Sequence, residues 1–155
     1  MDALDRRILR EVQLDCSQTA ANLAERCGTT ESTALRRLKR LQRSGVIRGQ
    51  VALVDGAKVG RSLLIFLSVR LEREDGPAVK TFVDRIRKHP DVLQFHFVTG
   101  SPDYIILLSA RTMEDYDAFL QEYVVPDPFV VMSETNVVIR SLKMSTLTPV
   151  DSSSA

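Results

Sequence analysis

Apolar residues recur at helical spacing three times within the first fifty residues of the chain. The three stripes are Leu4, Ile8, Leu9 and Val12, then Leu23, Ala24 and Cys27, then Leu35, Leu38 and Leu41. Thr19 and Thr30 stand where N-cap residues are preferred, and Gly28 and Gly45 stand where helices end. The pattern predicts three short helices. The turn of residues 28–30 between the second and the third is typical of a helix-turn-helix.

From Ser62 onward the pattern alternates between strands and helices. Strands are predicted over residues 63–71, 92–98, 104–108 and 129–142, and helices begin at Gly76-Pro77 and Thr112. This βαββαβ order predicts a ferredoxin-like sheet with two helices on one face. Several strands are apolar on both faces, so we expect a second subunit's sheet to cover the open face.

The two patterns divide the chain into four segments and give an α+β fold class. Residues 1–48 are predicted to form a helix-turn-helix DNA-binding domain, and residues 62–145 a ferredoxin-like domain for oligomerisation and effector binding. Residues 49–61 are a linker strand and turn, in which Val51–Val54 is predicted as a short strand or wing. Residues 146–155 are predicted to be a flexible tail because they are polar and terminal.

Composition excludes several protein classes. The 155 residues are 44% hydrophobic and 26% charged, which is ordinary for a globular protein. Every apolar run is shorter than the ~18 residues of a membrane span. The opening MDALDRRILREV lacks the pattern of a secretory signal, and the two cysteines fit no metal spacing. We therefore expect a cytoplasmic, nucleoid-associated protein that uses no metal or other cofactor. No catalytic Ser/His/Asp set or phosphate-binding glycine loop is found, so we expect no enzyme activity.

Charge is concentrated around the third predicted helix. Residues 1–50 hold 10 Lys/Arg and 6 Asp/Glu, and the stretch from Ser32 to Val54 holds six cations and no acid. Leucines occupy one side of this helix, whereas hydroxyls and then cations occupy the other, as in a recognition helix that enters the major groove. Arg36 can offer two hydrogen bonds to a guanine. The predicted contacts to double-stranded DNA are Ser32, Thr33, Arg36, Arg37, Lys39, Arg40, Arg43 and Arg48.

Six short matches, in the same order and spacing over about 140 residues, resemble the Lrp/AsnC, or feast/famine, family of regulators. They are Leu4-Asp5-Arg6-Arg7-Ile8-Leu9, Leu23-Ala24 to Gly28, Arg36-Arg37-Leu38 with Leu41, Ser44-Gly45-Val46-Ile47, His96 to Gly100 with Asp103-Tyr104, and Thr135 to Lys143. The resemblance implies a winged helix-turn-helix followed by the ferredoxin-like domain called RAM. It also implies dimers that assemble into octamers or related discs, and an amino-acid effector that shifts assembly or DNA affinity.

The resemblance further implies an effector site at the turn of residues 98–104 and at hydroxyls on the last strand. Ser133 and Thr135 lie on one face of that strand, where hydroxyls can bind an α-carboxylate or α-amino group. The expected effector-binding residues are Gly100, Asp103, Tyr104, Ser133 and Thr135.

Two other functions fit the same architecture. Siroheme decarboxylases resemble it, and in such an enzyme His96 and pocket arginines would contact a tetrapyrrole. The basic face of the third helix is not needed for that reaction and favours the regulator. The other alternative is a ligand-sensing assembly that binds DNA without sequence preference, in the manner of a chromatin protein.

Overall fold

A computed structural model describes residues 1–72 and 76–151 and divides the chain into two compact units. The helix unit contains Met1–Leu53 together with the chain from Lys143 onward, and the sheet unit contains Val54–Leu142. The division therefore falls inside the predicted linker of residues 49–61. In the described residues, no helix is long and apolar enough to cross a membrane.

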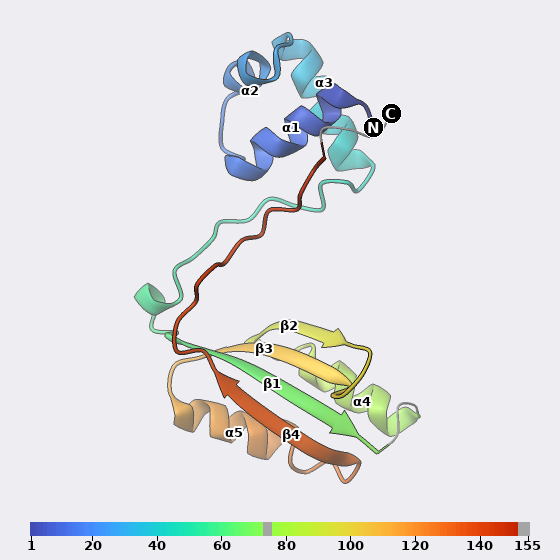
Figure 1. Ribbon diagram of the computed structural model, residues 1–155, viewed down its shortest axis with the longest axis vertical. Coiled ribbons are helices and arrows are strands. Elements are labelled where there is room, and N and C mark those ends of the chain that lie inside the picture. Colours follow the sequence, from blue (N-terminus) through green and yellow to red (C-terminus); the bar gives the residue numbers. More distant parts are fainter. Residues whose placement is uncertain (73–75, 152–155) are drawn as a thin grey trace. The chain divides into compact units, whose positions relative to one another are not determined.

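The helix unit contains α1 (Ala3–Leu14), α2 (Ala20–Cys27) and α3 (Glu31–Arg43), seen in Figure 1. Each helix begins at a side chain that accepts a hydrogen bond from a free backbone N–H: Asp2, Thr19 and Thr30. Gly28 ends α2 in the left-handed conformation at φ 62°, which a residue with a Cβ adopts at a cost. The joint between α2 and α3 thus has the predicted helix-turn-helix form.

Three helices close around a small apolar core. Its buried members are Ile8, Leu9, Leu23, Ala24, Cys27, Ala34 and Leu41. The prediction that Leu35 belongs to this core is wrong. Leu35 is 37% exposed, whereas Ala34 beside it is fully buried. The buried side of α3 runs through Ala34, Leu38 and Leu41, so it is rotated away from Leu35.

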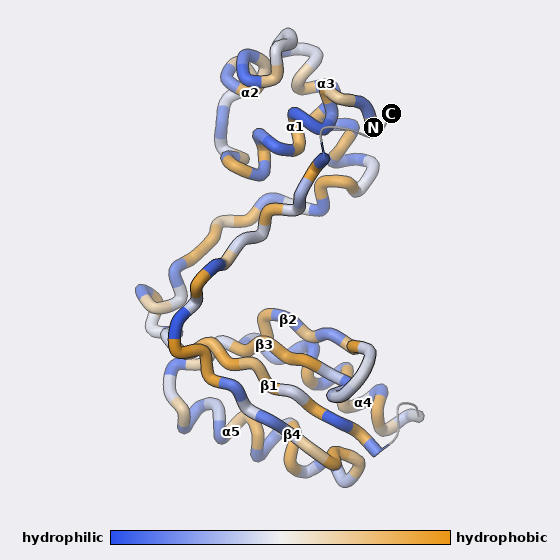
Figure 2. The backbone as a smooth tube through the Cα atoms, viewed as in Figure 1, coloured by the Kyte–Doolittle hydropathy of each residue, from blue (hydrophilic) through white to orange (hydrophobic). Residues whose placement is uncertain are grey.

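The segment after α3 differs from its prediction. All of residues 44–62 are described and none of them lies in a strand, so the expected strand or wing at Val51–Val54 is absent. The one regular element in that segment is the short 3-10 helix η1 (Ala57–Val59). Figure 2 shows an apolar run along Val51–Val54, and Val51 and Leu53 are more than three-quarters exposed. Apolar side chains alone do not make a strand that has no hydrogen-bonding partner.

The predicted flexible tail is also corrected in its described part. Gln13 on α1 and the backbone of Thr148 exchange two hydrogen bonds, of 2.7 Å and 3.1 Å. Val150 packs against the helix-unit core, and the Arg6 guanidinium donates to the carbonyl of Asp151 at 3.1 Å. Residues 148–151 therefore contact the helix unit through Thr148, Val150 and Asp151. Residues 152–155 lie outside the described residues.

The sheet unit has the predicted βαββαβ order. Its elements are β1 (Leu63–Leu71), α4 (Pro77–Ile86), β2 (Val92–Phe97), β3 (Tyr104–Ala110), α5 (Met113–Tyr123) and β4 (Val130–Val137). The strands form one antiparallel sheet in the order β2-β3-β1-β4, which confirms the ferredoxin-like fold. β4 ends at Val137 and not at Leu142. One more hydrogen bond, from the Val138 N–H to the Leu64 carbonyl at 2.9 Å, lies next to the first residue of β1, Leu63.

Alternation along β1 and β3 gives the sheet two different faces. Ile65, Leu67 and Val69 are fully buried against α4 and α5, which Figure 1 shows on one side of the sheet. Phe66, between them on β1, is 41% exposed on the opposite face. The helices thus leave one sheet face uncovered within the sheet unit.

Candidate functional site

α3 presents the predicted DNA-facing residues on its outward side. Ser32, Arg36, Lys39 and Arg43 are all exposed, and they lie opposite the buried Ala34 and Leu41. Thr33 is half-buried, and its hydroxyl accepts a hydrogen bond from the Thr30 hydroxyl at 2.8 Å within the N-cap. Arg48 is exposed in the segment that follows the helix. The outward side of α3 combines hydroxyls at its beginning with cations along its length.

Two arginines of α3 point toward α1 instead. Arg37 donates to the carboxylate of Asp5 at 3.2 Å and also to that of Asp2, and Arg40 donates to the second oxygen of Asp5. Asp5 is fully buried and the Arg37 side chain is 20% exposed. The expectation that Arg37 contacts DNA is therefore corrected: its guanidinium lies between two carboxylates and joins α1 to α3.

The ion pairs between Asp2, Asp5, Arg37 and Arg40 shift the pKa values of two of these side chains. The pKa of Asp2 falls to about 2, because its carboxylate accepts the backbone N–H of Asp5 and the guanidinium of Arg37. The pKa of Arg37 is raised by its hydrogen bonds to Asp2 and Asp5. A buried carboxylate requires such partners, since an unpaired buried charge is strongly unfavourable. Arg40, whose side chain is 55% exposed, both joins this cluster and reaches solvent beside the outward cations.

Asp2 and Asp5 are not among the site residues predicted from the sequence, yet they pair with two of the predicted DNA contacts, Arg37 and Arg40. Their signal in the sequence is the position of two acids one helical turn apart before an apolar stripe, together with an arginine on the inner flank of the third helix. They join α1 to α3 through Arg37 and Arg40.

The turn of residues 98–104 is fastened to the end of β1 by Asp103. The Asp103 backbone N–H donates to Val69 at 3.1 Å, its carbonyl accepts from Val98 at 2.9 Å, and its carboxylate accepts the Leu71 N–H at 2.7 Å. Gly100 adopts φ 95°, which favours glycine at this position. The Asp103 carboxylate thus binds the backbone of β1, in addition to the effector-binding role expected from the sequence.

The other expected effector residues occupy different positions around the buried strand β1. Tyr104 is 7% exposed and its ring packs against Phe95 and Phe97, at centroid distances of 5.2 Å and 5.3 Å. Ser133 is exposed on β4, and Val69 of β1 lies between it and Tyr104 in the sheet. The Thr135 hydroxyl is 2.6 Å from the hydroxyl of the buried Tyr116.

Asp103, Tyr104 and Ser133 are all neighbours of Val69 on β1, whereas Thr135 lies beside Tyr116 of α5. A hollow of about 320 Å³ opens beside the start of α4, and none of the five residues lines it. Its lining residues are Glu72, Gly76, Pro77, Ala78, Val79, Pro128 and Phe129. In the part of the chain that the structure describes, no group of His, Cys, Asp and Glu side chains is placed to hold a metal ion.

Two family models match this chain, and they correspond to its two units. A winged helix-turn-helix DNA-binding model matches residues 1–48, and the Lrp/AsnC ligand binding domain matches residues 64–148. The chain belongs to the Lrp/AsnC family of transcriptional regulators. The resemblance and the fold expected from the sequence are thereby confirmed.

Relatives of this Lrp/AsnC regulator match it over nearly its whole length. The HTH-type transcriptional regulator AldR of Mycolicibacterium smegmatis is 34% identical over 143 residues, covering 92% of this chain and 84% of the relative. The leucine-responsive regulatory protein of Rhizobium meliloti is 33% identical and covers 92% of both chains. A transcriptional regulator from Neisseria meningitidis, crystallised as a complex with L-Met, has a TM-score of 0.90 at 29% identity and covers 96% of each chain.

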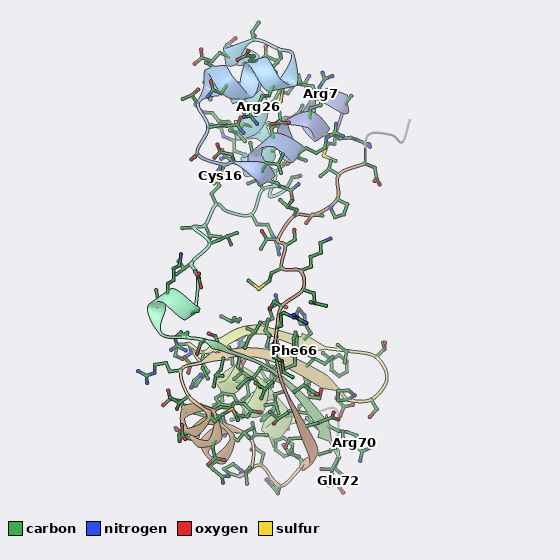
Figure 3. All side chains as sticks on the ribbon, turned by 60° about the vertical axis from the view of Figure 1, so that its left-hand side comes forward. Arg7, Cys16, Arg26, Phe66, Arg70 and Glu72 are labelled. Atoms are coloured by element: carbon green, nitrogen blue, oxygen red, sulfur yellow. The ribbon has the colours of Figure 1, made fainter. Side chains whose placement is uncertain are left out.

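The Lrp/AsnC regulator carries an apolar surface on the uncovered face of its sheet. Phe66 and Arg70 lie on this face of β1, and Glu72 follows directly after the strand (Figure 3). Ile105 and Leu107 of β3 lie opposite Ser68 and Phe66 and are half-buried. His96 is exposed on the same face of β2, with its Nε2 atom 3.3 Å from the Gln94 amide oxygen. His96 therefore lies on an open sheet surface and not in a pocket of this chain.

Proposed function

We propose that this chain regulates transcription as a homo-oligomer that binds specific sequences in double-stranded DNA through α3 and changes its assembly when an amino acid binds. The regulator class follows from the family, and the DNA contacts, the effector and the assembly are the proposal. The observation that carries it is the outward side of α3, where cations are exposed and free of the ion pairs that hold Arg37.

The proposed division of labour on α3 is between base reading and phosphate binding. Ser32, Thr33 and Arg36 lie in the first half of the helix, the end that reaches base edges when a recognition helix enters the major groove. Lys39, Arg43 and the exposed side of Arg40 hold phosphates, together with Arg48 after the helix. Such contacts place two recognition helices of a dimer in successive major grooves.

Titration of fluorescent duplexes with the full-length protein tests this division. Arg36→Ala is expected to cost roughly 1–3 kcal/mol at the preferred sequence and to relax its choice of base. Arg43→Ala is expected to weaken binding to all duplexes and to reduce the salt slope by about one. Lys58→Ala, an exposed cation of the sheet unit, is the matched control. An unchanged sequence preference in Arg36→Ala removes this residue from base readout.

Self-association is proposed to proceed through the uncovered sheet face. Phe66, Ile105 and Leu107 form its apolar centre, and a second copy of the same surface supplies equivalent apolar contacts. Because none of the five expected effector residues lines the hollow beside α4, we place the effector where the turn of residues 98–104 meets another copy. Dimers, and octamers built from them, are the assemblies expected from the sequence.

An amino-acid effector is supported by the ligand-binding family model and by the L-Met complex of the Neisseria regulator. Light scattering with each of the twenty amino acids, combined with mobility shift on the chain's own upstream DNA, tests the link. At least one amino acid is expected to change both the mass and the DNA affinity. If no amino acid at millimolar concentration changes the mass or the DNA affinity, the effector proposal is contradicted. If adding a tetrapyrrole to the protein changes the visible absorbance of the tetrapyrrole, the enzyme alternative is supported. In this proposal the chain catalyses no reaction, and it acts in the cytoplasm in association with the nucleoid.

A further inference from the structure

Leu35 is the apolar member of the outward side of α3. It is 37% exposed, and it is absent from the side chains that pack into the described core of the helix unit. Leu38 and Leu41 on the same helix both contribute to that core. Leu35 is therefore the most exposed leucine of α3, and more than a third of its surface is open to a partner outside the helix unit.

The neighbours of Leu35 are the residues proposed to contact DNA. On a helix, residues three or four apart lie side by side, so Leu35 lies between Ser32 and Lys39, and Arg36 follows it. Helical side chains lean toward the N-terminus of their helix. The leucine side chain consequently covers the surface near Ser32, at the end of α3 that enters the groove.

Contact with DNA affects Leu35 differently from its neighbours. Hydroxyl and guanidinium groups gain hydrogen bonds from base edges and phosphates, but a leucine gains only where it meets another apolar group. The major groove offers one such group, the 5-methyl of thymine. We propose that Leu35 is a specificity-determining residue that packs on the methyl group of a thymine beside the base pair contacted by Arg36. This inference rests on the proposed role of α3 in base reading.

Replacing thymine by deoxyuridine tests the inference directly, because only the methyl group is removed. The preferred duplex is first selected from a random pool with the full-length protein, and each thymine is then replaced singly. At one thymine of each half-site, the wild type is expected to bind the uracil duplex about fourfold more weakly, the value of one buried methyl group. Leu35→Ala is expected to bind the thymine and uracil duplexes equally.

Two further variants keep the experiment informative. Leu35→Gln keeps a long side chain and a similar helix propensity but replaces the apolar end of the side chain with an amide. It is expected to lose the preference for the thymine methyl group, as Leu35→Ala does. Leu53→Ala removes a leucine that is 77% exposed outside α3, and it is expected to keep the wild-type preference. Circular dichroism and thermal unfolding establish that each variant is folded.

The outcomes separate this inference from the proposed function. If the selection converges and Arg36→Ala relaxes it, but no thymine responds to uracil or both Leu35 variants keep the response, Leu35 does not read a methyl group and the regulator proposal stands. If the selection fails to converge on any sequence, base reading by α3 is wrong and the inference falls with it.

Discussion

The two units of this regulator are stabilised in different ways. The described core of the sheet unit contains fourteen buried side chains, all of them apolar or aromatic. The helix unit has half as many, and one fully buried carboxylate, Asp5, lies beside them and pairs with Arg37 and Arg40. Small units bury a smaller fraction of their surface. In the helix unit, ion pairs between α1 and α3 supplement an apolar core that is limited in size.

The surfaces of the two units also differ, with charged groups on the helix unit and apolar groups on the sheet unit. The helix unit exposes cations that suit a polyanion, whereas the sheet unit exposes an apolar face that suits another apolar face. Charge is thus placed in two ways in the helix unit, inward in the ion pairs between α1 and α3 and outward along α3, where the proposed function assigns it to DNA. The variants below separate these two uses and compare them with the apolar contacts of the sheet unit.

The largest effect is expected from Asp5→Asn. Loss of the buried charge removes one of the two carboxylates that pair with Arg37 and the carboxylate that pairs with Arg40, which should lower the free energy of unfolding of the helix unit by about 3 kcal/mol. Urea denaturation followed by circular dichroism measures the change. The matched control is Glu11→Gln, which breaks the more exposed pair with Arg26 and should cost under ~1 kcal/mol. Equal losses in the two variants would show that the buried ion pairs contribute no more to the free energy of unfolding than the exposed pair does.

The next effect is expected from Phe66→Asp on the open sheet face. A charge at the centre of an apolar interface should weaken self-association by about 2 kcal/mol, roughly thirtyfold in the dissociation constant. Sedimentation velocity over a range of concentrations measures it. Met113→Asp changes an apolar residue that is also nearly half exposed, at the start of α5, and should leave assembly unchanged. A dimer that survives Phe66→Asp would exclude this face as the interface.

A smaller effect is expected where the C-terminal segment meets α1. Gln13→Ala removes both hydrogen bonds to Thr148, and Val150→Ala removes part of an apolar contact, so each should lower helix-unit stability by about 1 kcal/mol. Thermal unfolding of the full chain measures the change. Met144→Ala, at a position that is 83% exposed, is the control and should have no effect. If Gln13→Ala is also silent, the segment contributes nothing to the unit.

The smallest effect, confined to acid, is expected from Asp2→Asn. The pKa of Asp2 is about 2 in the folded chain against 3.8 as its ordinary value. Because the folded value is the lower one, the stabilisation is present above pH 4 and is lost as the pH falls toward 2. The stability difference between wild type and Asp2→Asn should therefore shrink over this interval. A difference that stays constant from pH 6 to pH 2 would contradict the pairing of Asp2 with Arg37.

Local chemistry made most of the fold predictable. Thr19, Thr30 and Thr112 accept the hydrogen bonds of the N-caps where the sequence places them, and Gly28 takes the left-handed conformation. Capping depends on residues within one turn, so it can be derived without knowledge of the tertiary structure. The alternation in residues 63–71 likewise predicts β1 with the bounds that it has in the structure.

Contacts between distant residues were not predictable in the same way. Arg37 looks like one more cation of a basic helix until Asp5, 32 residues earlier, is placed beside it. Leu35 fits the leucine spacing of α3, but the small side chain of Ala34 lets the helix approach its neighbours on another side. The last residues are polar in composition, yet Thr148 contacts α1 through its backbone, which composition does not report.

The return of the C-terminal segment to α1 makes the helix unit discontinuous in sequence, with the sheet unit inserted between its two parts. During synthesis α1, α2 and α3 leave the ribosome before the sheet unit, whereas Thr148 and Val150 leave it after the sheet unit. The helix unit therefore acquires its contacts with this segment only after the whole sheet unit has been synthesised. A fragment ending at residue 48 would be an incomplete version of it.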